Sequence, residues 1–231
     1  MHSRKVRNVG KLCIPIVEKT VEKALVAIKE TNGLADLIEL RVDYLKRVNL
    51  APLLENRQKP FIVTNRREEE GGKYKGEERK RLSVLQEAID LGGDYIDVEL
   101  ATERSFLQSL IRNKGGTQVI LSFHDFHRTP SLKELEKLFD QMIRLGADVI
   151  KIVPFARSWE DNLSILSLIP FAKERRQKIV AFCMGEKGKI SRIFSPFLGA
   201  AWTYASLNKS RASAPGQLTA RELMDTWEKM R

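Results

Sequence analysis

The sequence predicts a (β/α)8 barrel, in which eight parallel strands, each followed by a helix, close into a ring. Short apolar runs alternate with longer amphipathic stretches at a spacing of about 25 to 30 residues, which is typical of repeated βα units. Eight such units can be counted along the 231 residues. An open doubly wound sheet is the alternative, but no GxGxxG sequence follows the first apolar run, which weakens its dinucleotide-binding version.

Strands are expected at the eight apolar runs, which are rich in aliphatic and β-branched residues. These runs are 11–17, 37–42, 60–65, 95–100, 118–123, 149–153, 179–184 and 202–206. Helices are expected between them at 20–30, 77–91, 102–113, 131–145, 159–175 and 219–230. Ser131 with Glu134, and Thr219 with Glu222, have the spacing of capping boxes at helix starts.

The size of the chain predicts one domain over residues 1–231, because it can bury one sizeable core and contains nothing that resembles a linker. Segment 1–10 is basic but lacks the apolar core of a signal peptide, and no apolar run approaches the roughly 20 residues that span a bilayer. Cys13 and Cys183 lack CxxC spacing, which favours small buried hydrophobes over a disulfide or a zinc site. We therefore expect a cytoplasmic protein without a membrane partner.

The net charge of +10 is of the kind that binds nucleic acids when lysines and arginines are clustered. Here the basic residues are spread over the expected helices and interleaved with glutamates, as in 77–81 and 173–176. This pattern is typical of solvated helix faces. We expect no nucleic-acid partner, and a basic binding module stays the non-enzymatic alternative.

Lys151 stands in the middle of the apolar run 148–155, and lysine is almost never fully buried unless it is paired or used. Loss of water disfavours the charged form of an amine, so a desolvated lysine becomes a nucleophile that can form an imine with a ketone. A lysine on an edge strand that extends its ammonium group to solvent would fit the same run. The run alone leaves both interpretations open.

Ionisable residues recur at period two in expected strands that should be apolar if helices cover them. Glu39, Arg41 and Asp43 share one strand face, and Asp97 and Glu99 repeat the pattern two runs later. In an antiparallel sheet this face would be the solvent side. In a barrel, helices cover the outside, so these charges would point into the barrel near its mouth, where such enzymes keep their active sites.

His124 and His127 follow the fifth apolar run. Adjacent parallel strands lie about 4.8 Å apart, so His124 and Lys151 can reach one substrate, whereas we interpret His127 as structural. Arg66, after the third run, could bind an anion, and Glu70 could orient His124. The same charged stretch could equally be a solvated loop.

Two late loops hold further candidates. The segment after the seventh run has Gly185 and Gly188, which allow close backbone approach, and Arg192 at a helix start, suited to a carboxylate or phosphate. Residues 213–217, with sequence Ser-Ala-Pro-Gly-Gln, follow the eighth run. Taken singly, this motif is a Pro-Gly turn and indicates no function.

Together these segments resemble type I 3-dehydroquinase, the imine-forming dehydratase of the shikimate pathway. The resemblance covers nearly the whole chain and keeps the motif order. Its motifs are 39–43, 66–72, 122–127, 146–148 leading to Lys151, 184–192 and 213–217. The combination of Ser-Phe-His-Asp-Phe-His at 122–127 with Ser-Ala-Pro-Gly-Gln at 213–217 is the most specific part.

The resemblance implies a (β/α)8 barrel, usually a homodimer, that dehydrates 3-dehydroquinate to 3-dehydroshikimate without metal or cofactor. It implies that Lys151 forms the imine, that His124 shuttles protons, and that Glu70 orients the histidine. It further implies two sets of substrate ligands: Arg192, Ser213 and Gln217 for the carboxylate, and Glu39, Arg41 and Arg66 for the ring hydroxyls. A class I aldolase or transaldolase would share the barrel and the lysine but cleave a carbon–carbon bond, and the two specific motifs do not point to it.

Overall fold

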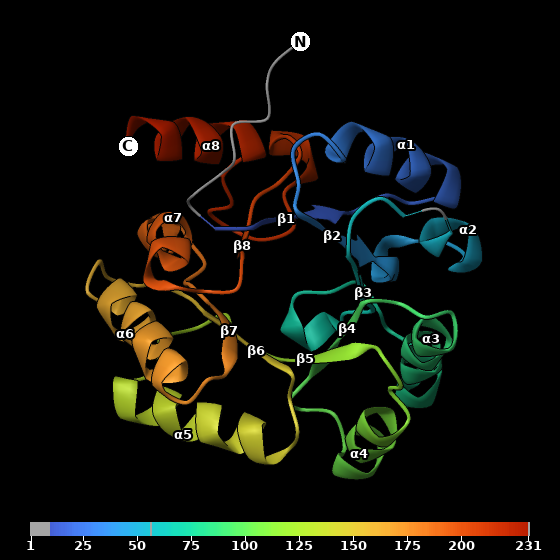
Figure 1. Cartoon of the computed structure of the whole chain (residues 1–231), viewed down its shortest axis with the longest axis horizontal. Coiled ribbons are helices and arrows are strands. Elements are labelled where there is room, and N and C mark those ends of the chain that lie inside the picture. Colours follow the sequence, from blue (N-terminus) through green and yellow to red (C-terminus); the bar gives the residue numbers. More distant parts are fainter. Residues whose placement is uncertain (1–9, 56, 231) are drawn as a thin grey trace.

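The computed structural model describes residues 10–55 and 57–230, which form a ring of strands surrounded by helices (Figure 1). Residues 1–9, which make up most of the basic segment 1–10, lie outside the described residues, as do positions 56 and 231. The expected (β/α)8 barrel is confirmed. Across the described ranges no helix combines the length and the apolar composition needed to cross a membrane.

The barrel wall consists of eight parallel strands in the order β7-β6-β5-β4-β3-β2-β1-β8. They are β1 (Leu12–Ile16), β2 (Leu37–Arg41), β3 (Phe61–Thr64), β4 (Tyr95–Glu99), β5 (Gln118–Asp125), β6 (Val149–Pro154), β7 (Lys178–Ala181) and β8 (Thr203–Tyr204). The seam between β7 and β8 is bridged by a hydrogen bond from the Ala201 backbone N–H to the Ile179 carbonyl, at 2.7 Å. The barrel is therefore nearly closed.

Helices connect and surround the strands. They are α1 (Val21–Thr31), α2 (Ala51–Leu54), α3 (Glu78–Asp90), α4 (Arg104–Arg112), α5 (Leu132–Arg144), α6 (Asp161–Glu174), α7 (Lys189–Leu198) and α8 (Ala220–Lys229). Short 3₁₀ helices are η1 (Val42–Tyr44), η2 (Glu68–Glu70) and η3 (Lys209–Arg211). Both predicted capping boxes, at the starts of α5 and α8, are confirmed.

Two of the expected strands, the seventh and the eighth, differ from the structure by more than a residue or two. The prediction of 179–184 is wrong at its end, because β7 stops at Ala181 and the Cys183 backbone N–H is taken by the Ser191 hydroxyl, at 2.8 Å. The prediction of 202–206 is too long, because β8 has only two residues and the Ser206 backbone N–H donates to the Leu218 carbonyl instead of to a strand. Helices α2 and α7 had no predicted range of their own.

The apolar core lies mainly between the strands and the helices. Leu85 of α3, Phe139 of α5 and Leu168 of α6 are fully buried against the outer faces of the strands. Each such side chain contributes about 1.5 to 3 kcal/mol relative to an exposed one. This layer holds the barrel together from outside and leaves the inside available for polar groups.

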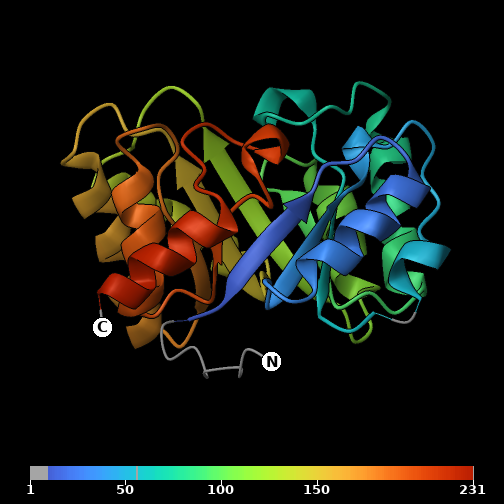
Figure 2. The ribbon, with the colours of Figure 1, turned by 90° about the horizontal axis from the view of Figure 1, so that it is seen from above.

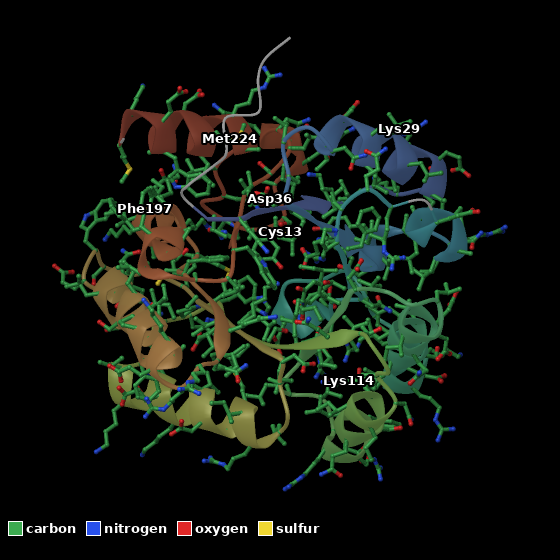
Figure 3. The ribbon with its side chains drawn as sticks, in the orientation of Figure 1. Cys13, Lys29, Asp36, Lys114, Phe197 and Met224 are labelled. Atoms are coloured by element: carbon green, nitrogen blue, oxygen red, sulfur yellow. The ribbon has the colours of Figure 1, made fainter. Side chains whose placement is uncertain are left out.

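The inside of the barrel is apolar at one end and ionic at the other, since each of β2 to β6 carries an inward apolar or aromatic residue followed two positions later by a polar one. The pairs are Leu37 and Glu39, Ile62 and Thr64, Tyr95 and Asp97, Ile120 and Ser122, and Val149 and Lys151. Figure 3 shows Cys13 of β1 among the side chains near the middle of the ring, with Lys29 of α1 at its rim. In Figure 2 the arrowheads of β1 (blue) and β5 (yellow-green) point to the same end, so the polar positions face the loops that follow the strands.

Candidate active site

A cavity at the carboxyl ends of the strands collects every site residue predicted from the sequence. Its volume is about 480 Å³, part of it open to solvent. The predicted residues in its lining are Glu39, Arg41, Arg66, Glu70, His124, Lys151, Arg192, Ser213 and Gln217. Their positions along the chain range from β2 to the loop before α8, so only closure of the barrel brings them together.

Lys151 of β6 lies inside the barrel and only 5 % of its surface is exposed, which excludes the edge-strand interpretation. Its Nζ donates to Asp97 Oδ2 at 2.9 Å and to Glu39 Oε1 at 3.4 Å. The Tyr204 ring centroid lies 4.6 Å from the same nitrogen. The lysine is therefore buried among carboxylates and an aromatic face, so it is paired as well as desolvated.

Asp97 of β4 is the closest ionic partner of Lys151 and was not among the predicted site residues. Its Oδ1 accepts from Arg66 Nη2 and from the Ser122 hydroxyl, both at 2.6 Å. Burial acts to raise the pKa of Asp97, but the neighbouring Arg66 and Lys151 cations outweigh it and hold the pKa well below its usual range. The period-two pattern placed Asp97 inside the barrel but could not show which cation it meets.

His124 of β5 and Glu70 of η2 form a pair in the cavity wall. The histidine Nδ1 lies 2.9 Å from Glu70 Oε2, and both side chains are about nine-tenths buried. This contact leaves the histidine Nε2 as the nitrogen available to a substrate. The structure thus places Glu70 where the sequence prediction needed it to orient His124.

Burial disfavours the charged form of both members of this pair. It raises the pKa of Glu70 to about 7, although the Arg66 cation opposes the rise. It lowers the pKa of His124 well below 6.5, and the cations Arg66 and Lys151 lower it further. Since the two groups share a hydrogen bond, the proton they gain near neutral pH belongs to the pair.

Arg192, in the first turn of α7, has a different environment. Its exposed fraction is 1 %, yet its Nε and Nη2 have no hydrogen-bond partner among the described residues. Its guanidinium carbon lies 4.3 Å from the Phe182 ring centroid, and burial lowers its pKa to about 10. A buried cation with free donors is suited to a carboxylate or phosphate ligand.

The loop from Ser213 to Gln217 closes one side of the cavity. Gln217 Oε1 accepts from the Ser213 backbone N–H at 2.8 Å and from its hydroxyl at 3.2 Å. Gly216 has φ +70°, and a Cβ there would lie 2.1 Å from the Gly185 carbonyl oxygen, so only glycine fits. The Pro-Gly turn is therefore docked on the loop that follows β7.

The remaining predicted groups line the cavity to different extents. Glu39 accepts from the Thr64 hydroxyl at 2.9 Å, and Arg41 is held by both oxygens of Asp43, at 2.9 and 2.7 Å. Asp43 itself does not line the cavity, because β2 ends at Arg41 and the alternation of faces ends with it. His127 is exposed and also lies outside the lining.

Several lining residues were not among the predicted site residues, because their side chains are apolar or aromatic. They are Phe126, Val153, Phe182, Met184, Tyr204 and Ala214. Apolar side chains give no chemical signal in a sequence, and only the registers of β6 and β8 and the paths of the loops place them around the polar groups. They supply walls that exclude water from the lysine and the histidine.

The fold is a (β/α)8 barrel, and a buried lysine lies at its carboxyl end beside a histidine that contacts a carboxylate. These features are typical of enzymes that form an imine with a carbonyl substrate. A family model described as "Type I 3-dehydroquinase" matches residues 12–230. The chain belongs to the type I 3-dehydroquinase family.

Individual relatives agree with this assignment. The 3-dehydroquinate dehydratase of Methanocaldococcus jannaschii is 36 % identical over 221 residues, which are 95 % of this chain and 98 % of that one. The chloroplastic bifunctional 3-dehydroquinate dehydratase/shikimate dehydrogenase of Arabidopsis thaliana is 34 % identical over 228 residues, 96 % of this chain and 37 % of that one. The type I enzyme of Clostridium difficile, solved with covalently modified comenic acid, has a TM-score of 0.87 and 28 % identity, covering 96 % and 92 % of the two chains.

Proposed function

We propose that this chain dehydrates 3-dehydroquinate to 3-dehydroshikimate, a step of the shikimate pathway to aromatic amino acids, through an imine on Lys151. The observation that carries the proposal is the meeting, in one cavity, of three groups. These are a lysine beside two carboxylates, the His124–Glu70 pair, and Arg192, two of whose nitrogens lack a hydrogen-bond partner in the part of the chain that the structure describes. They match the ketone, the acidic C–H bond and the carboxylate of this substrate.

The imine supplies an electron sink next to the proton that must leave. The Lys151 amine adds to the substrate ketone and water departs, which leaves a cationic C=N bond. His124 then removes the C2 proton through Nε2. The electron pair of that C–H bond forms a double bond between C2 and the imine carbon, and the C=N π pair moves to the nitrogen, which gives an enamine. Its collapse expels the C1 hydroxyl, which His124 protonates, and water hydrolyses the product imine to free Lys151.

Substrate binding is assigned to two sides of the cavity. Arg192, with Ser213 and Gln217, would hold the carboxylate, because its free donors are already desolvated. Glu39, Arg41 and Arg66 would bind the ring hydroxyls, since all three line the cavity wall. Both arginines are also tied to carboxylates, so a hydroxyl would meet pre-oriented donors.

The ultraviolet absorbance of the conjugated product tests the proposal. Purified protein should generate this absorbance on addition of 3-dehydroquinate, and the product should be 3-dehydroshikimate by chromatography. A product cleaved at a carbon–carbon bond would point to an aldolase, and binding of RNA with steep salt dependence and no turnover of ketones would point to a binding module.

We also propose that the chain works as a homodimer. Ile190, Phe194, Phe197 and Leu198 of α7 are between 38 % and 45 % exposed, and Figure 3 shows Phe197 at the rim of the ring. A second copy that covered these side chains would remove them from water. Light scattering should give twice the chain mass, and Phe194→Glu should lower it toward one. A wild-type monomer would contradict this assembly.

We propose that residues 1–231 form a single domain. We also propose that the protein works in the cytoplasm and has no nucleic-acid or membrane partner. Cys13 and Cys183 are buried free thiols, as a reducing compartment allows, and burial raises the pKa of Cys183 to about 11. The protein should therefore be recovered in the soluble fraction of cells and should unfold in one transition. Recovery with membranes or nucleic acid would contradict this.

A further inference from the structure

A chain of buried ion pairs extends from the reactive lysine away from the cavity. Lys151 contacts Asp97 at 2.9 Å, Asp97 contacts Arg66 at 2.6 Å, and Arg66 contacts Glu99 at 3.0 Å. The side chains of Asp97 and Glu99 are completely buried. Carboxylates without access to water need these cations, since an unpaired buried charge is very costly.

The chain ends at Arg81, a residue of α3 on the outer side of the strands (Figure 1). Its Nη1 donates to Glu99 Oε2 at 2.5 Å and to the Asn65 carbonyl at 3.0 Å, just past the end of β3. On its other side, Nε and Nη2 donate to the two oxygens of Glu78, both at 2.8 Å. Arg81 is 0 % exposed although it comes from a surface helix.

Three members of this chain are shared between neighbours, and the first is Asp97, which serves both Lys151 and Arg66. Arg66 serves both Asp97 and Glu99, and Glu99 in turn serves both Arg66 and Arg81. If Arg81 were absent, Arg66 would be the remaining cation beside Glu99, with the Arg67 backbone N–H at 3.2 Å as the other donor, and the guanidinium would be drawn toward Glu99 and away from Asp97. Asp97, the closest anion to the Lys151 amine, would then lose its fixed position.

We propose that Arg81 is a positioning residue for the reaction: by neutralising Glu99 from α3, it lets Arg66 hold Asp97 beside Lys151. This inference rests on the proposed function, because it assigns Arg81 a role in imine formation. It places the outermost determinant of the site on α3, and neither Arg81 nor any other residue of that helix lines the cavity.

A purely structural role is the competing explanation, since Arg81 also fastens α3 to the end of β3. Arg57 provides the matched control at the opposite end of β4. Its Nε donates to Asp94 at 2.8 Å, and its other nitrogens donate to the carbonyls of Leu54 and Gly92. It joins one carboxylate and two carbonyls, whereas Arg81 joins two carboxylates and one carbonyl, and it has no connection to Lys151.

The experiment compares Arg81→Met, Glu99→Gln, their double variant and Arg57→Met. We expect Arg81→Met to lower kcat and the rate of borohydride trapping by about tenfold, while KM changes much less because Arg192 and Gln217 are untouched. The double variant should recover most of the lost kcat, since the uncompensated charge of Glu99 is gone. Arg57→Met should lower Tm and leave kcat and the trapping rate unchanged.

A double variant slower than Arg81→Met, or Arg81→Met with normal trapping and lowered Tm, would overturn the positioning role. Where Arg81→Met does not fold, Glu78→Gln decides: its side chain is 32 % exposed, and weakening the outer contact of Arg81 should cause a smaller loss of kcat in the same direction. Unchanged kcat in folded Glu78→Gln would then overturn it. A wild-type protein that forms no adduct would instead overturn the proposed function.

Discussion

Two buried cations of the cavity, Lys151 and Arg192, have opposite environments. Lys151 is surrounded by partners that belong to the protein, with Asp97 and Glu39 within hydrogen-bonding distance. Arg192 is buried more deeply, yet two of its nitrogens have no partner within the described residues and its guanidinium faces the Phe182 ring. The lysine thus has its ionic partners within the protein, whereas the arginine keeps buried donors that a bound anion would satisfy.

This difference indicates a division of labour. Groups that take part in bond making must be held in place before reaction, because their preorganisation lowers the barrier. A group that only captures substrate gains more from being left unsatisfied, since the ligand then supplies the missing interaction. Substitutions in the two regions should therefore differ in which property they change.

The largest effect is expected in the first region from Lys151→Ala, which removes the imine-forming amine. Turnover should vanish, and borohydride with substrate should leave no adduct. In the wild-type protein, mass spectrometry of the digest should find the adduct on Lys151. Lys114→Ala is the control, because that lysine pairs with Asp148 away from the cavity. An adduct on another lysine would exclude the imine mechanism proposed here.

His124→Ala should stall the reaction one step later. Loss of a general base usually costs about 10² to 10⁴ in rate, and more is possible where one group serves several steps. Borohydride should still trap an adduct on Lys151 while turnover is nearly abolished. His127→Ala should retain most activity, because His127 is exposed and outside the cavity lining. Reversal of these two results would show that the wrong base has been assigned.

Arginine substitutions test the comparison most directly. Arg192→Ala should raise KM by roughly ten- to a hundredfold, the equivalent of about 1.5 to 3 kcal/mol for a charge-assisted contact, with little loss of stability without ligand. Arg66→Ala should instead destabilise the fold by about 3 to 5 kcal/mol, because it leaves Asp97 and Glu99 buried without their shared cation. Denaturant unfolding and steady-state kinetics measure both. If Arg192→Ala and Arg66→Ala lowered the free energy of unfolding equally, the proposed difference between the two regions would be wrong.

The smallest expected effect is a displaced pH profile in Glu70→Gln. In the wild type, Glu70 gains a proton as the pH falls through about 7, donates it to His124 Nδ1 and so places the imidazole proton on Nε2. The base is then lost, so kcat/KM should fall below about pH 7. Without the carboxyl group, only His124 titrates, with its lowered pKa, and the acid limb should move to lower pH while kcat drops. If the acid side of the pH profile did not move in Glu70→Gln, the fall in kcat/KM would have to arise from the titration of another group.

Local sequence features were sufficient for several elements and insufficient for others. The capping boxes at Ser131 and Thr219 mark helix starts because each depends on residues three positions apart. The end of β7 could not be foreseen, since it depends on Ser191, eight residues later, taking the Cys183 backbone N–H. The roles assigned to the lining residues stay predictions until they are tested.

Strand periodicity and side-chain chemistry are local properties, so the amino-acid sequence was enough to predict the βα repeat, the inward face of the polar strand positions, and Lys151, His124 and Arg192 as candidate site residues. Which of these groups meet depends on the folded barrel. Asp97 lies 54 residues from Lys151, and Arg81 lies 18 residues from Glu99 on a separate element. Barrel closure and the register between strands set those contacts, and both arise from interactions among distant residues that no single stretch of sequence contains.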